Sequence, residues 1–267
     1  MRRMDAVTFE VGGDAVGVVT LNRPDKLNAM NDAVFTGLLE AAATAAEAAA
    51  DGRCRAVLVI GGGRAFSAGL DVSLFAAQAG GEVPDDAFIS RLQQAFTAFE
   101  DLPVPTVAAV RGVALGAGCQ LAIACHLRIA AEDTSIGLLE ARWGLLPDLG
   151  GTWRLPRLIG LSRATDMAMT ARTVDAPTAL AWGLVDAVAE SDTDFEPWAR
   201  DYTARLAAGP TVATGVVAGL MRDSYRLDRA AVLAAERAAQ QRCLASDDFR
   251  EAATAAMQGR APNFAGR

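Results

Sequence analysis

The chain of 267 residues is 52% hydrophobic and 21% charged, so it is long enough for one sizeable core and too apolar for a disordered protein. Its 32 acidic residues outnumber its 25 basic ones, and a net charge of −7 argues against binding to nucleic acid or to an anionic membrane. The single histidine, His126, excludes a His-rich metal site. The four cysteines form no C-x-x-C pair, which indicates reduced thiols in a cytoplasmic protein.

Strand-like and helix-like runs alternate through the first half of the chain. In chain order we expect strands at 7–11, 17–21, 56–60, 106–110 and 127–131, helices at 32–50 and 86–102, a compact helix ending near residue 124, and a loop over 71–84. This alternation predicts an α/β fold in which helices cover a largely parallel sheet.

The later part of the chain is mostly helical in pattern. We expect helices at 163–170, 176–182, 195–207, 230–243 and 247–257, with one short strand at 184–189. The domain organisation is therefore an α/β core over 1–195 followed by a helical region over 196–267. The N-terminus leads into no apolar stretch, so we expect no signal peptide.

Two glycine-rich segments, 61–63 and 116–121, follow expected strands. The first lacks the Gly-Lys-Ser/Thr ending of a phosphate-binding loop, and the second has Leu121 where a dinucleotide fingerprint needs its last glycine. Glycines between a strand and a helix can also present unpaired backbone N–H groups to a ligand. Segments 66–71 and 114–118 fit that description, and together they could form an oxyanion hole. Close packing of helix on strand is the alternative explanation.

Two carboxylates, Glu140 and Asp148, bracket an apolar stretch that contains glycine and proline. Burial would raise the pKa of such carboxyl groups toward values useful for acid–base catalysis. The alternative is that Arg142 or Arg154 neutralises them structurally. Gln120 lies among apolar residues, so we expect its amide to be buried and hydrogen-bonded, able to orient a group but not to carry a proton.

Two further polar residues have competing interpretations. His126, between Cys125 and Leu127, is expected to be a structural histidine at a helix end rather than a catalytic group. Lys26, the only lysine of the chain, is either an exposed turn residue or a phosphate contact.

Three blocks of sequence stand out: Asn-Arg-Pro-Asp-Lys-Leu-Asn-Ala at 22–29, Arg-Ala-Phe-Ser-Ala-Gly-Leu-Asp at 64–71 and Gly-Val-Ala-Leu-Gly-Ala-Gly-Cys at 112–119. They resemble the signature blocks of the crotonase (enoyl-CoA hydratase/isomerase) superfamily. The segments 144–152 and 259–264 continue the match in the same order. The resemblance covers nearly the whole chain and is specific for the family.

The resemblance implies a spiral of ββα repeats with a helical C-terminal trimerisation region, assembled as a homotrimer or a dimer of trimers. It implies an acyl-CoA substrate in fatty acid metabolism, with coenzyme A as part of the substrate and no separate cofactor or metal. It also assigns residues by position in the matching blocks. The thioester oxygen would be held by the backbone N–H groups of Leu70 and Ala117, and the substrate or its CoA would be bound by Lys26, Ala29, Ala68 and Asp71.

The chain differs from enoyl-CoA hydratases at catalytic positions, and these differences bear on which reaction it catalyses. Enoyl-CoA hydratases carry two catalytic glutamates, of which the first is replaced here by Gln120 and the second is retained as Glu140. Asp148 matches the catalytic aspartate of dienoyl-CoA isomerases and of ring-modifying aryl-CoA isomerases.

Hydration needs both a base and an acid, whereas moving a double bond needs only groups that remove a proton and return it elsewhere. We therefore expect double-bond isomerisation with Glu140 and Asp148 as acid–base groups and Gln120 orienting substrate or water. The alternatives are a 2-enoyl-CoA hydratase that uses Glu140 and a catalytically silent acyl-CoA-binding protein.

Overall fold

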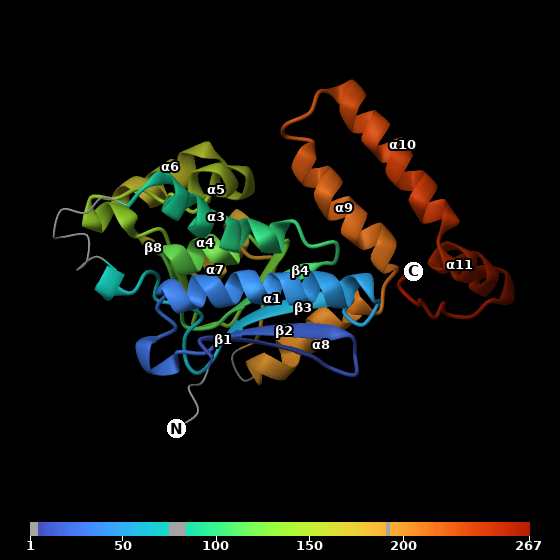
Figure 1. The fold of residues 1–267 in the computed structure, drawn as a ribbon, viewed down its shortest axis with the longest axis horizontal. Helices are drawn as coiled ribbons and strands as arrows, with labels where there is room; N and C mark the ends of the chain where they lie inside the picture. Colours follow the sequence, from blue (N-terminus) through green and yellow to red (C-terminus); the bar gives the residue numbers. More distant parts are fainter. Residues whose placement is uncertain (1–4, 75–83, 191–192) are drawn as a thin grey trace.

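The computed structural model describes residues 5–74, 84–190 and 193–267, and a six-stranded sheet lies at its centre (Figure 1). β1 and β2 are antiparallel, and every later pair of neighbours is parallel. The strands lie in the order β1 (Val7–Val11), β2 (Val16–Leu21), β3 (Ala56–Gly61), β4 (Thr106–Val110), β6 (Leu127–Ala130) and β9 (Ala187–Val188).

Side chains on alternate positions of the strands enter two different cores, because successive residues of a strand point to opposite faces. In β3, Val57 and Val59 enter the larger core, which is covered by α1 (Asp32–Ala50) and α3 (Asp86–Glu100). Ala56 and Leu58 enter the smaller core, which is covered by α8 (Phe195–Ala207). The sheet is thus sandwiched between two helical layers.

The sequence directly explains α1. The Asn31 side chain caps the helix by accepting a hydrogen bond from the N–H of Val34, and Val34, Leu38, Ala41 and Ala45 fall on one buried face. Among the described residues, α1 is the single helix with the length and apolarity of a membrane span; α8 and the helix after it meet that test only as a pair bent by 99°. The apolar face of α1 packs inside the core.

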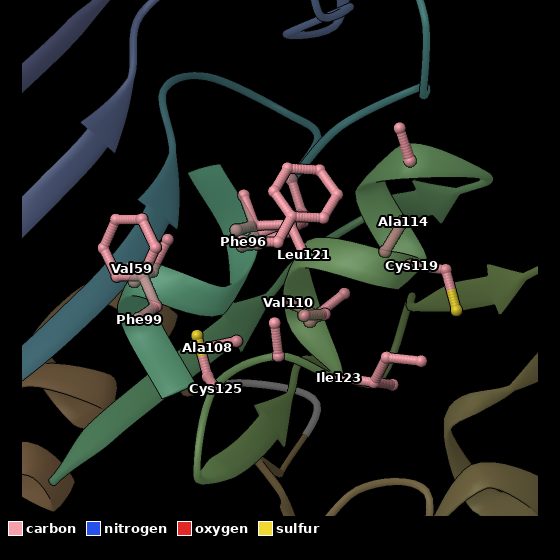
Figure 2. Close-up of a cluster of buried hydrophobic side chains, with 14 of the residues drawn as sticks. Val59, Phe96, Phe99, Ala108, Val110, Ala114, Cys119, Leu121, Ile123 and Cys125 are labelled. Carbon is pink, nitrogen blue, oxygen red and sulfur yellow. The ribbon is translucent and has the colours of Figure 1, made fainter. Parts of the chain in front are cut away.

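A second, smaller sheet builds the region next to the candidate site. It consists of β5 (Val113–Leu115), β7 (Ser135–Gly137) and β8 (Thr173–Asp175), with β5 parallel to β7 and β7 antiparallel to β8. The short helix α4 (Ala117–Ala122) follows β5 and is entirely buried. Its Cys119 and Leu121 join Phe96 and Phe99 of α3 in the buried cluster drawn in Figure 2.

Further helices complete the chain. The short helices near the site are the 3-10 helices η1 (Pro24–Lys26) and η2 (Glu140–Trp143), followed by α5 (Gly151–Ile159), α6 (Leu161–Thr170) and α7 (Ala176–Trp182). At the C-terminal end follow α9 (Thr211–Asp223), α10 (Arg229–Ala245) and α11 (Asp247–Gln258). In Figure 1 α10 stands away from the body of the molecule, whereas α9 contacts the turn after α3, where Arg222 pairs with Asp101. Val217, Met221, Leu233, Leu244 and Phe249 of these helices are exposed.

The C-terminal tail is held in place by polar side chains, one from the body of the molecule and one from α11. Arg55 donates to the carbonyl oxygens of Gly209 and Phe264, at 2.7 and 2.8 Å. The Asp248 carboxylate accepts hydrogen bonds from the N–H groups of Ala265 and Gly266. These contacts fix where the projecting helices leave the body of the molecule.

Several elements differ from the sequence-based expectation. The expected strands and long helices are present, most within three residues of their predicted ends, although the strand expected at 184–189 is only Ala187–Val188. The strands β5, β7 and β8 and the helices α5 and α9 were not anticipated. Most of the loop expected over 71–84 lies outside the described residues.

Candidate active site

One cavity of about 810 Å³ collects all nine residues that the sequence singled out for the site. The cavity lies between α3, the start of α4, and the segment that runs from η2 into α5. Apolar side chains form much of its wall: Phe88, Ile89 and Leu92 from α3, and Trp143, Leu145 and Leu146 from the segment between the two carboxylates. The predicted residues on its wall are Lys26, Ala29, Ala68, Leu70, Asp71, Ala117, Gln120, Glu140 and Asp148.

Segments 66–71 and 114–118 lie side by side on one wall of this cavity. The N–H of Ser67 donates to the carbonyl of Val113, and the N–H of Leu115 donates to the carbonyl of Ser67, both at 2.9 Å. Gly69 has φ +98°, and a Cβ on it would lie 2.7 Å from the carbonyl oxygen of Leu115. Only glycine permits both that backbone conformation and that approach.

The backbone N–H groups of Leu70 and Ala117 are left unbonded by this pairing. Met30 pairs with the residues on either side of Leu70, because its N–H donates to Gly69 and its carbonyl accepts from Asp71. Ala117 is the first residue of α4, where no helical carbonyl is available to its N–H. Neither N–H has a hydrogen-bond partner within the described part of the chain, and both residues line the cavity.

Glu140 extends a carboxyl group into a poorly solvated position. Its Oε1 accepts a hydrogen bond of 2.7 Å from Gln120 Nε2, and its Oε2 is buried without a partner among the described residues. A Cβ on Gly116 would lie 3.3 Å from Oε1, so this glycine leaves room for the carboxyl group. Burial raises the pKa of Glu140 above its ordinary value, and the negative charge of Asp148 adds to that rise, whereas the Gln120 bond opposes it.

Asp148 lies on the same cavity and is half-buried, and that burial raises its pKa. Its backbone carbonyl accepts a hydrogen bond of 2.6 Å from Gln93 of α3. The suggestion that an arginine neutralises the two carboxylates is wrong. Arg142 donates to the carbonyl of Ala171, and Arg154 forms an ion pair of 2.6 Å with Glu100.

Gln120 is buried and fully engaged at its oxygen, as the sequence predicted. Oε1 accepts hydrogen bonds from the N–H groups of Leu149 and Gly151, each at 2.9 Å. Nε2 donates to Glu140. The side chain therefore joins the Glu140 segment to the residues that directly follow Asp148.

Lys26 and Asp71 line the cavity in different surroundings. Lys26 ends η1 and is exposed, so its ammonium group is free to meet an anionic part of a ligand. Asp71 accepts from the N–H and hydroxyl of Ser73 and pairs with Arg23 at 2.8 Å, and these contacts hold its pKa below the ordinary value. Asp71 thus fixes the loop that carries Leu70.

Sequence reasoning missed the polar support beneath this wall. Asn28 is buried, has φ +54°, and donates from Nδ2 to the carbonyls of Gly62 and Ala65. Its own carbonyl accepts a hydrogen bond from the Ser67 hydroxyl. The signal that could have identified these two residues was their position inside two of the signature blocks. Asn28 also suits its left-handed backbone, because asparagine tolerates that conformation better than most residues.

His126 takes no part in the site. Its Nδ1 accepts from the N–H of Thr106, and its Nε2 lies 3.0 Å from the carbonyl oxygen of Glu100. A ring with one accepting and one donating nitrogen is neutral, and burial lowers its pKa. The prediction of a structural histidine is confirmed.

Comparisons with known proteins define the family. The model of the enoyl-CoA hydratase/isomerase family matches residues 12–267. A Rhodobacter capsulatus protein named "Probable enoyl-CoA hydratase" is 37% identical over 98% of both chains. The 1,2-epoxyphenylacetyl-CoA isomerase of Escherichia coli is 32% identical over 94% of this chain and 95% of its own.

A crystal structure of an enoyl-CoA hydratase from Bacillus anthracis superimposes with a TM-score of 0.88 at 30% identity, covering 98% of this chain and 100% of the other. The chain belongs to the enoyl-CoA hydratase/isomerase family and is an enzyme with the crotonase fold, as the sequence resemblance predicted. The catalytically silent alternative is thereby set aside.

Proposed function

We propose that this enzyme moves a carbon–carbon double bond in an acyl-CoA thioester through an enolate intermediate. The observation that carries the proposal is the pair Glu140 and Asp148 on one cavity, with an amide, Gln120, at the position where hydratases place their first glutamate. The family acts on acyl-CoA thioesters, so the substrate class follows from membership.

The first step needs a place for negative charge. In the proposal the N–H groups of Leu70 and Ala117 bind the thioester oxygen and stabilise the enolate. Their support is that both residues line the cavity and that neither N–H has a partner among the described residues, on segments held together by backbone hydrogen bonds. Each such donor typically contributes 10²–10³ in rate.

The proton then moves between two carbons. Starting from a 3-enoyl thioester, Glu140 removes a proton from C2, and the electron pair forms a dienolate whose charge rests on the thioester oxygen. Asp148, in its protonated form, gives a proton to C4, so the double bond ends between C2 and C3. Glu140 then returns its proton to Asp148 through solvent, and the cycle closes.

The alternative reaction is hydration of a 2-enoyl thioester by Glu140 alone. The Rhodobacter and Bacillus relatives carry hydratase names and the Escherichia coli relative an isomerase name, so the family admits both reactions. Hydration would require one group to activate water and another to protonate C2. Gln120 cannot carry a proton, which favours isomerisation.

We also propose how the enzyme binds its substrate, where it acts and how it assembles. Lys26 binds the anionic part of CoA, Ala29 and Ala68 line the path of the CoA, and Asp71 holds the loop that carries Leu70. Coenzyme A enters as part of the substrate, so no further cofactor is required. The exposed apolar side chains of α9–α11 support assembly as a homotrimer or a dimer of trimers. The four free cysteines support a cytoplasmic location. Membership of the family supports a role in fatty acid metabolism.

The test is to incubate the purified enzyme with 3-enoyl-, 2-enoyl- and 3,5-dienoyl-CoA in D₂O and to follow products by mass spectrometry. We expect isomerised products carrying deuterium and little 3-hydroxyacyl product. Fast hydration of the 2-enoyl thioester without isomerisation of the other two would overturn the proposal in favour of the hydratase.

A further inference from the structure

Gln120, which the sequence suggested would orient substrate or water, has every acceptor position of its side chain occupied within the protein. The amide oxygen has two lone pairs, and both are used, by Leu149 N–H and Gly151 N–H. Reversing the amide would place its NH₂ group against two N–H donors, so this orientation is the only one that hydrogen bonding allows. Nε2 is consequently directed at Glu140.

The bonds of Gln120 join the two carboxylate-bearing parts of the site. Glu140 begins η2, and Leu149 and Gly151 belong to the turn that carries Asp148 into α5. One buried side chain therefore bonds to Glu140 on one side and to both neighbours of Gly150 on the other. A Cβ on Gly151 would lie 2.9 Å from Gln120 Oε1, so this glycine leaves room for the contact.

Resting on the proposed function, we propose that Gln120 is a positioning residue, which holds Glu140 as the ionised base at a fixed place relative to Asp148 and does not contact the reacting carbons. An amide N–H stabilises the charged form of the carboxylate that accepts from it. Its oxygen at the same time holds the turn after Asp148.

The substitution Gln120→Glu distinguishes a residue that positions Glu140 from one that contacts the substrate. One carboxylate oxygen at position 120 can still accept from Leu149 and Gly151, so the turn after Asp148 keeps its bonds. The other oxygen then faces Glu140 Oε1 at the present separation of 2.7 Å, where two carboxylates must share a proton. Glu140 consequently loses its proton only at higher pH.

The experiment is an infrared titration of the ligand-free enzyme, with the Glu140 carboxyl band identified by its loss in Glu140→Gln. We expect Gln120→Glu to raise the pH midpoint of that band by at least about one unit, because interacting carboxylates titrate as a coupled pair. Gln94→Glu is the matched control, since Gln94 is exposed on α3 and the same chemical change there leaves the midpoint in place.

Kinetics provide the second readout. We expect Gln120→Glu to shift the acidic limb of the pH profile of kcat/KM in the same direction while KM stays within about twofold of wild type. Gly151→Ala, which displaces Gln120 without changing either carboxylate, should lower kcat with the same small effect on KM. An unchanged infrared midpoint in Gln120→Glu, or a loss confined to KM, would overturn the inference. The infrared midpoint does not depend on which reaction is catalysed, so it tests the inference even if the isomerase proposal fails.

Discussion

Gly118→Ala tests the alignment of the two backbone N–H groups most sharply. Gly118 is the second residue of α4, and a methyl group there would lie 2.6 Å from the carbonyl oxygen of Ser67 and 2.8 Å from its Cβ. Ordinary contact begins near 3.4 Å, so α4 and the segment carrying Leu70 must separate by roughly 0.8 Å. That displacement acts directly on the spacing between the N–H groups of Leu70 and Ala117.

The expected consequence is a large loss of rate with the fold retained. A misplacement of about 1 Å can cost about 10²-fold, and losing one oxyanion donor costs 10²–10³-fold. We therefore expect kcat/KM to fall about 10²-fold, which corresponds to about 2.7 kcal/mol of transition-state stabilisation. Alanine is a better helix former than glycine by about 1 kcal/mol, which offsets part of the steric cost.

The assay is deuterium exchange at C2 of a saturated acyl-CoA in D₂O, which needs only a base and a stabilised enolate. Gly219→Ala in α9 is the matched control, because a Cβ there meets nothing within 4 Å. The control should exchange at the wild-type rate with unchanged or higher Tm. An exchange rate for Gly118→Ala within threefold of wild type would refute the proposed role of these N–H groups.

Other predictions concern the carboxylates and their support. Glu140→Gln should lower C2 exchange by 10²–10⁴-fold at neutral pH. Burial raises the pKa of Glu140 in the folded state, so the stability of the wild-type enzyme falls as the pH rises from 4.5, the ordinary pKa of a glutamate, through the raised pKa. The Tm of Glu140→Gln relative to wild type should therefore increase across this pH window. A Tm difference that stays constant across the window would contradict the prediction. Asp148→Asn should keep C2 exchange but lose deuterium delivery to C4; equal loss of both would argue against separate roles. Arg154→Met removes the ion-pair partner of the largely buried Glu100 and should cost about 3–5 kcal/mol in urea unfolding, whereas a loss below 1 kcal/mol would show that the pair is dispensable.

Local patterns in the sequence were sufficient to predict the long helices and strands. The capping Asn31 and the buried spacing of α1 are local properties, and β4 is a run of five buried residues of which the last four are apolar. By contrast, β5, β7 and β8 have three residues each, too few for a periodic pattern, and they exist because they pair with one another.

Misleading local signals hid two helices. The pair Gly150-Gly151 and Pro156 indicate a loop, yet Gly150 adopts φ +91° ahead of α5 and Pro156 lies inside that helix. In α9, Gly215 resembles a helix breaker, but a Cβ there would lie 1.9 Å from the carbonyl oxygen of Pro103. Close packing on a distant segment is the reason for that glycine, and no local pattern shows it.

The sequence could predict which residues line the candidate site but not which hydrogen bonds and ion pairs they form. Position within the matching blocks identified nine residues that line one cavity. The partners of Gln120 lie 20, 29 and 31 residues away, and the ion pair of Arg154 with Glu100 spans 54 residues. Such contacts are set by the tertiary fold, so the sequence could indicate a buried amide but not which groups it joins.

The most direct test of the account is the fate of a 3-enoyl-CoA in D₂O, followed by NMR at each carbon. The account predicts conversion to the 2-enoyl thioester with deuterium incorporated at C4, at a rate that collapses in Glu140→Gln. A wild-type enzyme that leaves the 3-enoyl thioester untouched, or a Glu140→Gln variant that converts it at the wild-type rate, would contradict the assignment.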